Sequence, residues 1–351
     1  MTHSKPDRRQ FIRNNALALA GAAIAPATIA GVKLGTHIET KDGNQPRSPG
    51  FYRFAFGDLE ITILSDGHFD YSPAWVRLEN PVEVQAYNAD PETREKYFRS
   101  RLVPSDLIPL QMNPILIDTG DKRTLVDPGM GTGTEEWPSP PNAGRLGLSL
   151  EAAGISPGSI DQVILTHAHF DHMGGLIDPS TRTPFFPNAE VVISEEEFRF
   201  WMSDKAGPAL ESVFIDPLLD ATRSVLRFLD DRLRMVRTEE EVAPGIRSIP
   251  SPGHLPGHIC VCVGIESGGK QILLPGDAMV FTHVSFEHPE WEFSGDLDRK
   301  QAGQTRRRLL DRAVADKMLI LGYHFPFPGL GYALKYGDAF RWHPAGWTVL
   351  P

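Results

Sequence analysis

Cysteine is scarce in this chain of 351 residues, which has only Cys260 and Cys262. If the two lie in one strand, they point to the same face. That arrangement does not suit a bond between their sulfur atoms. The sequence therefore excludes a disulfide framework, and we expect two free thiols buried in a core strand.

Excess positive charge and phosphate-binding loops are also absent. The formal net charge is -10, and an acidic surface is repelled by nucleic acids and by anionic membranes. No G-x-G-x-x-G or G-K-[ST] segment follows an expected strand. We therefore expect no nucleic-acid partner and no nucleotide fold of these types.

Long apolar runs are missing too. The most apolar stretch, residues 16–30, is short and is interrupted by Gly21 and Pro26, so it does not make a membrane span. No stable membrane anchor is expected. A basic head, a short apolar stretch and small residues at its end describe an export signal.

The basic head has the pattern Arg-Arg-x-Phe-Ile-Arg over residues 8–13, which resembles a twin-arginine signal. We predict that residues 1–30 are this signal, cleaved after Ala27 or Ala30, and that the protein is periplasmic or secreted. Residues 31–50, which are polar with glycine and proline, are expected to form a linker or N-terminal arm.

Strands and helices alternate through the rest of the chain, so we predict one catalytic domain over residues 51–351. The pattern predicts strand pairs in 51–67 and 113–129, a strand before His167, a strand and helix in 189–204, and three strands in 245–280. Helices are expected at 149–155, 208–231 and 305–318, and a last strand and loop at 319–337. This order favours an α/β (α+β) fold of layered sheets flanked by helices.

One segment, THAHFDHMGG (residues 166–175), concentrates metal-binding side chains at the end of the apolar run Val163-Ile164-Leu165. His167 and His169 face the same way at the strand end, and Asp171 and His172 follow where the chain turns. Four ionisable groups at a buried strand end are costly without a counter-ion. Imidazole and carboxylate suit zinc, iron or manganese, and four ligands in six residues suggest a second ion.

The pattern His167-x-His169-x-Asp171-His172 resembles the signature of the metallo-β-lactamase superfamily. Three later segments match further motifs of that family in order: SPGHLPGH (251–258), LLPGDAMV (273–280) and LGYHFPFPGLGY (321–332). The resemblance covers roughly residues 50 to 345. It implies a four-layer αββα sandwich with the metal site at one edge of two packed sheets.

The resemblance also implies the roles of single residues. One divalent ion would be bound by His167, His169 and His254, the other by Asp171, His172 and His324, with Asp277 between the two ions. The family pattern prefers His254 to His258, which is expected to lie behind the ligands or in the core. Asp127, in the segment LVDPG, is expected to lie beneath the ions. Zinc is the first expectation, and manganese, cobalt or iron fit the same ligands.

Such a dinuclear site implies a hydrolase in which a metal-bridging hydroxide attacks a carbonyl or phosphoryl centre. Asp171 is the catalytic residue that we expect to orient that hydroxide or to carry a proton to the leaving group. Four segments, among them FPNAEVVISEEEFRFW and HFPFPGLGY, resemble the methyl parathion hydrolase branch and its acyl-homoserine lactonase neighbours. The implied substrates are small esters or lactones, with organophosphate triesters as promiscuous ones.

Four aromatic residues are candidates for the substrate pocket, with ordinary helix packing as the alternative: Trp201, where the branch has an aromatic residue, and Phe198, Phe214 and Phe325. Other activities on the same fold also stay open. They are a thioesterase, a persulfide dioxygenase with one iron, and a binding protein without catalysis. The sequence leaves a homodimer open as well.

Overall fold

The computed structural model describes residues 28–29, 32–33, 50–103, 106–133, 139–214, 218–237, 239–264 and 269–346. Residues 48–351 form one compact unit, and residues 1–47 form another. In the latter unit β1 (Thr28–Ile29) pairs antiparallel with β2 (Val32–Lys33). The predicted export signal and arm otherwise lie outside the described residues.

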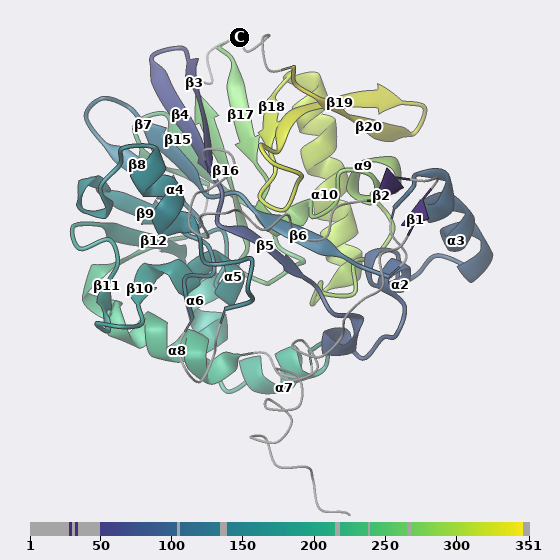
Figure 1. The fold of residues 1–351 in the computed structure, drawn as a ribbon, viewed down its shortest axis with the longest axis horizontal. Helices are drawn as coiled ribbons and strands as arrows, with labels where there is room; N and C mark the ends of the chain where they lie inside the picture. The colour runs from purple at the N-terminus through teal and green to yellow at the C-terminus, as the bar shows by residue number, and fades with distance from the viewer. Residues whose placement is uncertain are drawn as a thin grey trace, which may run out of the picture. The chain divides into compact units, whose positions relative to one another are not determined.

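The first large sheet is built from the chain between Phe51 and Val236 (Figure 1). Its parallel pairs join the strands that alternate with helices. Two of its antiparallel pairs, β3 with β4 and β7 with β8, are the predicted hairpins, and a third, between β4 and β7, joins them. In spatial order its strands are β13 (Leu233–Val236), β12 (Glu190–Ser194), β9 (Gln162–Ile164), β8 (Arg123–Val126), β7 (Ile115–Asp118), β4 (Leu59–Leu64) and β3 (Phe51–Phe56).

The second large sheet is built from the remaining chain and is antiparallel except between β17 and β18. In spatial order its strands are β14 (Glu240–Ala243), β15 (Ile246–Pro250), β16 (Ile259–Gly264), β17 (Gln271–Leu274), β18 (Leu319–Leu321), β19 (Leu330–Tyr336) and β20 (Ala339–Pro344). The hairpin of β19 and β20 extends beyond the last strand that the sequence predicted.

The two sheets pack face to face on an apolar core. Ile61, Ile117 and Val192 of the first sheet belong to the same buried cluster as Val261 and Ile272 of the second. Because side chains alternate along a strand, the neighbours of Val261 point to the other face. There Cys260 and Cys262 pack against helices, both buried and neither in a disulfide bond. The prediction of two buried thiols in a core strand is confirmed.

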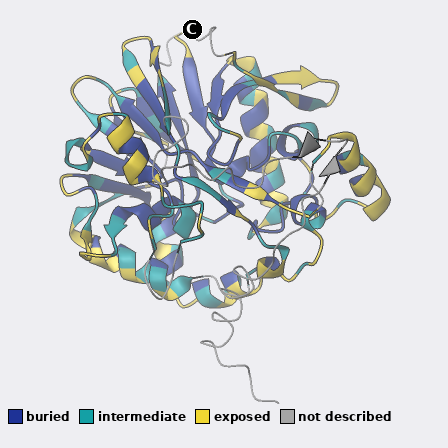
Figure 2. Ribbon diagram, viewed as in Figure 1, coloured by how far each residue is buried: buried dark blue, intermediate teal, exposed yellow. Residues whose placement is uncertain are grey.

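Helices cover the outer face of each sheet. The helices α4 (Leu146–Ala152), α6 (Glu195–Met202), α7 (Ala206–Glu211) and α8 (Leu219–Phe228) pack on the first sheet, and α9 (Val284–Glu287) and α10 (Arg299–Ala315) pack on the second. Figure 1 shows the sheets between these two sets, and Figure 2 shows the buried strands in dark blue. The predicted αββα layers are confirmed.

Local signals explain where these helices begin and end. The hydroxyl of Ser194 accepts a hydrogen bond from the Glu197 N–H and starts α6, and Asp298 starts α10 in the same way. Gly154 follows α4 with a positive φ of 72°, as expected of a glycine after a helix. The region predicted as one helix from 208 to 231 contains two helices, α7 and α8.

A smaller assembly lies beside the sheets and was not predicted. It contains the antiparallel pair β5 (Gly67–Asp70) and β6 (Pro109–Met112), the short helix η1 (Pro73–Val76), and the helices α2 (Pro81–Gln85) and α3 (Pro91–Ser100). Phe69, Tyr71 and Phe98 from this assembly share a buried cluster with Phe281 and Phe293. The cluster connects the assembly to the loops that follow β17.

Seven short elements complete the fold as the structure describes it. They are α5 (Phe170–Met173), η3 (Gly174–Leu176), the paired strands β10 (Ile177–Asp178) and β11 (Thr183–Pro184), η2 (Pro157–Ser159), η4 (Asp230–Arg232) and η5 (Gly276–Ala278). Among the helices that the structure describes, none has the length and apolar character needed to cross a bilayer.

Candidate metal centre

The candidate ligands all follow the carboxyl ends of strands. His167, His169, Asp171 and His172 come after β9, and His254 follows β15. Asp277 lies in η5 after β17, and His324 follows β18. Since β15, β17 and β18 run in the same direction within their sheet, their ends meet at one edge. The structure brings all seven side chains together there.

Three histidines form the first cluster, called here the His254 group: His167, His169 and His254. The Nδ1 atom of His169 lies 3.0 Å from the Nε2 atom of His167 and 3.0 Å from the Nε2 atom of His254. His167 is fully buried and His254 almost so. One nitrogen of each ring therefore points at a common centre.

Two histidines and a carboxylate form the second cluster, called here the His324 group: Asp171, His172 and His324. The Nε2 atoms of His172 and His324 lie 3.2 Å apart. Oδ2 of Asp171 lies 3.6 Å from the first of these nitrogens and 3.4 Å from the second. Asp171 keeps 17% of its side chain exposed, so this carboxylate lies on the open side of the site.

Asp277 lies between the two groups and contacts both. Its Oδ1 atom lies 3.2 Å from Nε2 of His172 and 3.2 Å from Nε2 of His324. Its Oδ2 atom lies 3.4 Å from Nε2 of His254. One carboxylate thus offers an oxygen to each group, which is the geometry that a bridging ligand needs.

The spacing of these atoms fits bound metal ions. Two nitrogens at about 2.05 Å from a tetrahedral zinc lie roughly 3.3 Å apart, close to the separations of 3.0 and 3.2 Å in the two groups. Oδ1 of Asp277 is buried and faces the Nε2 atoms of His172 and His324, both 3.2 Å away. A buried carboxylate needs positive charge beside it, and an ion held between the two groups would supply that charge.

The electrostatics of the two groups differ. Burial, together with the neighbouring imidazoles, lowers the pKa of His169 to about 3 and the pKa of His167 well below its ordinary value. Burial also opposes the charge of His324, but Asp277 and Asp171 outweigh it and raise its pKa to about 9. The same two carboxylates and Asp127 raise the pKa of His172. The imidazoles of the His324 group therefore hold protons when no ion is bound.

Asp127 lies beneath the His324 group, as the resemblance implied. Its carboxylate accepts hydrogen bonds from the Thr166 N–H at 2.8 Å, from the Thr166 hydroxyl at 2.7 Å and from Nδ1 of His172 at 2.9 Å. Its backbone has a positive φ of 52°, which is uncommon for a residue other than glycine, although aspartate adopts it more readily than most. Asp127 fixes both the strand end and the ring of His172.

His258 lies behind Asp277 and outside both groups. Its Nδ1 atom lies 2.8 Å from the Ser251 hydroxyl, and its Nε2 atom accepts a hydrogen bond from the Asp277 N–H at 3.0 Å. The ring therefore supports the turn that presents Asp277. This position agrees with the expectation that His254, and not His258, belongs with the ligands.

Three further polar groups at the site were not predicted. Nδ1 of His254 lies 2.9 Å from Oδ1 of Asp296, and Nδ1 of His324 donates to the Gln111 carbonyl at 2.6 Å. Oε1 of Glu197 accepts from the Ala168 N–H, between the first two histidines, at 2.9 Å. A signal for Glu197 was its spacing of four residues from Trp201, which places both on one face of α6.

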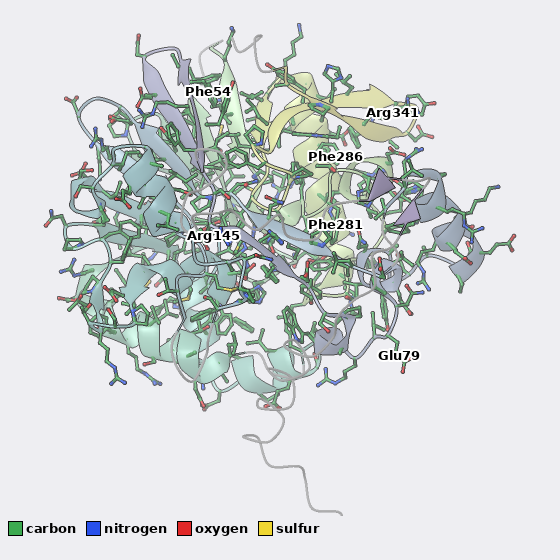
Figure 3. All side chains as sticks on the ribbon, viewed as in Figure 1. Phe54, Glu79, Arg145, Phe281, Phe286 and Arg341 are labelled. Carbon is green, nitrogen blue, oxygen red and sulfur yellow. The ribbon has the colours of Figure 1, made fainter. Side chains whose placement is uncertain are left out.

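The structure corrects two of the predicted pocket residues. Trp201 is 0% exposed, and its indole N–H donates to Oε1 of Glu197 at 2.7 Å. Phe325 is also 0% exposed and packs with Phe286, labelled in Figure 3, on the helical side of the second sheet. Neither ring has surface to offer to a substrate. Trp201 supports the loop of His167 and His169 from the interior.

The Trp201 ring lies behind His169, with the two centroids 5.9 Å apart, and three other rings also lie against the candidate ligands. Phe214, one of the predicted residues, is half-buried with its ring centroid 5.6 Å from that of His169. Phe69 is edge-on to His324 at 6.3 Å, and Phe293 stacks parallel to His254 at 6.2 Å. Phe198 instead packs against the cluster between the first sheet and its helices. The aromatic wall of the site therefore comes from three separate segments.

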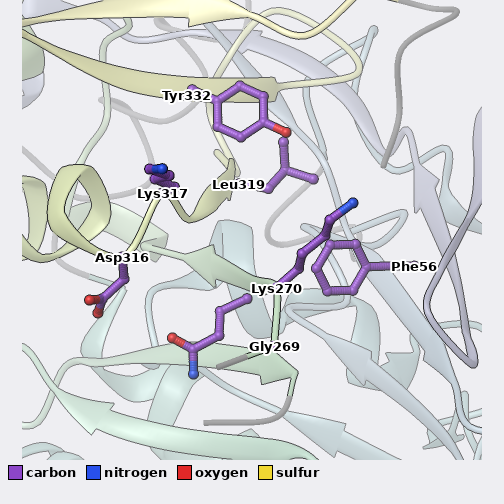
Figure 4. Close-up of a pocket in the computed structure, with 8 residues that line it drawn as sticks. Phe56, Gly269, Lys270, Asp316, Lys317, Leu319 and Tyr332 are labelled. Atoms are coloured by element: carbon purple, nitrogen blue, oxygen red, sulfur yellow. The ribbon is translucent and has the colours of Figure 1, made fainter. Parts of the chain in front are cut away.

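A surface hollow elsewhere on the second sheet does not contain the site. It is lined by Lys270, Lys317 and Tyr332, among others, at the beginnings of β17 and β18 (Figure 4). The candidate ligands follow the opposite ends of these strands. The hollow and the metal centre are thus separate features.

Comparison with known proteins agrees with this geometry. An N-acyl homoserine lactonase from a Bacillus species is 26% identical over 239 residues, which are 64% of this chain and 85% of the relative. The N-acyl homoserine lactonase AiiB of Agrobacterium fabrum is 30% identical over 204 residues, 53% of this chain and 69% of the relative. The chain is thus similar to metal-dependent hydrolases that open lactones.

A solved structure of AidC, described as a dizinc quorum-quenching lactonase in complex with a product, superposes with a TM-score of 0.73. It is 26% identical and covers 85% of this chain and 98% of its own. The sequence family described as the metallo-beta-lactamase superfamily matches residues 107–324, a range that contains every candidate ligand. The chain therefore belongs to the metallo-beta-lactamase superfamily.

Proposed function

We propose that this protein is a hydrolase with two metal ions that opens lactones, with acyl-homoserine lactones as the first class to test. The observation that carries the proposal is Asp277, which presents one oxygen to the His254 group and the other to the His324 group. The lactonase relatives support the substrate class, and the dizinc relative supports zinc as the metal.

The His254 group would hold one ion and the His324 group the other, with Asp277 bridging them. When bound there, two divalent ions would supply a hydroxide near neutral pH and would polarise the carbonyl carbon for its attack. The chain's own residues hold that arrangement fixed, since Asp127 fixes His172, Asp296 contacts His254 and His258 supports Asp277.

Asp171 is the residue that we assign to proton transfer. Opening a lactone joins an oxygen of water to the carbonyl carbon, breaks the ring C–O bond and returns a proton to the leaving oxygen. Asp171 keeps 17% of its side chain exposed, more than His172, His254, Asp277 or His324, so it can face the substrate. The Tyr323 hydroxyl donates to its backbone carbonyl at 2.6 Å and fixes its position.

Phe214, Phe69 and Phe293 would form the apolar side of the substrate site. Each ring lies against a different candidate ligand, on His169, His324 and His254 respectively. Apolar walls with a few placed polar groups are typical of small-molecule sites. This wall suits the acyl chain of a lactone or an ester, and organophosphate triesters with aryl groups would be secondary substrates.

The test is the initial rate of purified, metal-loaded protein on an acyl-homoserine lactone, an aryl ester and a methyl phosphotriester, measured side by side. We expect the lactone to dominate, with kcat/KM of about 10⁴ M⁻¹s⁻¹ or more, in the ordinary range of enzymes. A dominant phosphotriester rate would reverse the order of primary and secondary substrate. Slow turnover of all three, with one iron per chain, would contradict the proposal and favour the persulfide dioxygenase.

We further propose that the protein is exported by the twin-arginine route. The support is the basic and apolar pattern of residues 8–30. Replacing Arg8 and Arg9 with lysine in cells is expected to leave the protein in the cytoplasm, as measured by fractionation. Unchanged export would contradict this proposal and leave the metal centre unaffected.

A further inference from the structure

We propose that Asp296 and Arg306 form a buried positioning pair that holds His254 in its ligating orientation. The pair would therefore set the affinity of the ion in the His254 group and leave the other ion largely unaffected. This inference rests on the proposed function, because it assumes that the group binds an ion. Neither residue was expected from the motifs of the sequence.

The contact between Asp296 and His254 fixes the tautomer of the histidine. Oδ1 of Asp296 lies 2.9 Å from Nδ1 of His254, and the two side chains are 0% and 3% exposed. An ionised carboxylate only accepts hydrogen bonds, so the hydrogen of the neutral imidazole must lie on Nδ1. Nε2 is then left with its lone pair directed at the centre of the group. Partners of this kind orient metal-binding histidines and raise their basicity.

Arg306 satisfies the second oxygen of Asp296. The Nη2 atom of its guanidinium lies 3.3 Å from Oδ2 of Asp296, and the Arg306 side chain is 3% exposed. A buried carboxylate without a cation would be strongly disfavoured. Arg306 also donates to the carbonyl of Ala278 at 2.9 Å and to those of Pro289 and Trp291 at 3.1 Å. The guanidinium is therefore held in place by groups on three sides.

Backbone contacts join the same two segments. The N–H of Leu297 donates to the carbonyl of His254 at 3.0 Å, and the N–H of Asp298 donates to that of Gly253 at 2.9 Å. A Cβ atom on Gly253 would lie 2.3 Å from the backbone nitrogen of Ala302 in α10, and its φ is +135°. The start of α10 is thus packed directly against the loop that carries His254.

The pair acts on one group because the other has its own supports. His172 contacts the carboxylate of Asp127, and His324 donates to the backbone carbonyl of Gln111. Neither contact involves Asp296 or Arg306. The pair has one link to Asp277, the ligand that both groups share, because Arg306 donates to the backbone carbonyl of the next residue, Ala278. A defect in the pair should therefore be largest in the His254 group.

The test compares Asp296→Asn with a matched control, Asp298→Asn. Asp298 is exposed and caps α10 through the Gln301 N–H, so its change perturbs the same helix without touching His254. Metal-free protein is titrated with Zn²⁺ against a chromophoric chelator, without substrate. We expect Asp296→Asn to lower the affinity for one of the two Zn²⁺ ions by about 10- to 100-fold and to leave the affinity for the other unchanged. Asp298→Asn should bind both ions as the natural protein does.

Two further measurements separate positioning from a loss of fold. Nitrogen-15 spectra of the histidines should show a proton on Nδ1 of His254 in the natural protein and a redistributed proton in Asp296→Asn. Arg306→Lys keeps the charge but loses the planar fork of donors. It should lower the affinity for the same ion by a smaller factor, and it serves as the test variant if Asp296→Asn does not fold.

The inference is overturned if Asp296→Asn, or Arg306→Lys where the former does not fold, binds both ions with natural affinity. Weakening of both ions to the same extent in both variants would also overturn it. Failure of the unchanged protein to bind two ions would instead overturn the proposed function. The titration contains no substrate, so its result does not depend on which ester or lactone is hydrolysed.

Discussion

The His254 group and the His324 group meet at Asp277, but they are built from different chemistry. The first contributes three imidazoles, and burial keeps the pKa of His167 and His169 low. The second contains the carboxylate of Asp171, and its two imidazoles have raised pKa values. One group is ready to bind a cation as it stands, while the other is already occupied by protons.

This difference indicates how one site can hold two ions of the same charge close together. Neutral imidazoles would bind an ion without neutralising it, so positive charge would remain there to polarise a bound substrate or water. The carboxylates of Asp171 and Asp277 would reduce the repulsion between two such ions. The residues that hold the histidines also differ between the groups. Asp296, paired with Arg306, contacts His254 in the first group, and Asp127 contacts His172 in the second.

The strongest way to break the comparison is to remove the ligand that both groups share. Asp277→Ala is expected to lose at least one ion per chain and nearly all hydrolysis, because each ion contributes several kcal/mol of transition-state stabilisation. That corresponds to a drop in kcat of about 10³-fold or more. Metal content and kcat are measured on the same sample. Two ions and a full rate would show that Asp277 does not bridge them.

Asp127→Asn tests whether the supports belong to separate groups. The change removes the charge that His172 contacts, and we expect about 10- to 100-fold weaker binding of one ion. That ion should be the one that Asp296→Asn leaves unchanged. Titrating the double variant with Zn²⁺ checks this, because the two losses should then appear on different ions. Losses on the same ion would contradict the division into two groups.

The protons of the two groups give a third test. His324, with its pKa raised to about 9, carries a proton at pH 7.5 that an ion must displace, and the raised pKa of His172 acts in the same direction. Binding to the His324 group should therefore release protons, and its affinity should fall by roughly tenfold or more for each pH unit below 9. His167 and His169 carry none at pH 7.5, so the His254 group should release few.

Calorimetric titrations in two buffers of different ionisation enthalpy measure this release directly. The step assigned to the His324 group should depend on the buffer, and the other step should not. Equal proton release in both steps would mean that the two groups do not differ in charge when empty.

The smallest expected effects come from two aromatic substitutions, one of Trp201, which lies behind the candidate ligands, and one of Phe214, which lies at the proposed substrate site. Trp201→Phe removes the donor to the buried carboxylate of Glu197 and should lower the free energy of unfolding by about 1–3 kcal/mol. The ratio of rates on long-chain and short-chain lactones should stay the same. Phe214→Leu should change that ratio by roughly three- to fivefold, the equivalent of about 0.5–1 kcal/mol, with little effect on stability. A changed ratio in Trp201→Phe and an unchanged ratio in Phe214→Leu would instead indicate that Trp201 contacts the substrate.

The αββα layers and the meeting of the seven candidate ligands could be predicted because the resemblance to the metallo-β-lactamase superfamily implies both, and the motifs that carry it are short local segments. The apolar run before His167 predicted β9, and the motifs around His254, Asp277 and His324 lie at strand ends as expected. The burial of Trp201 could not be predicted from aromatic composition, because it depends on which face of α6 packs on the sheet.

The polar supports were hidden for a different reason. Asp296 and Arg306 lie ten residues apart around the start of α10, and both are buried by contacts with segments distant in the sequence, including the loop of His254 and the carbonyl of Ala278. Gln111 acts through its backbone carbonyl, which no side-chain pattern reports. Contacts of this kind are tertiary, so the sequence names the ligands more readily than the groups that orient them.

The origin of the ligands in both sheets has a consequence for folding. The first sheet leads into His167, His169, Asp171 and His172, and the second leads into His254, Asp277 and His324. Ions bound here would link the loops of one sheet to the loops of the other, so neither half of the chain alone could bind both ions. The free energy of ion binding then becomes free energy of folding. At a free ion concentration of 100 times the Kd it adds about 2.7 kcal/mol, and a chelator would loosen the packing of the two sheets before it affected either one alone.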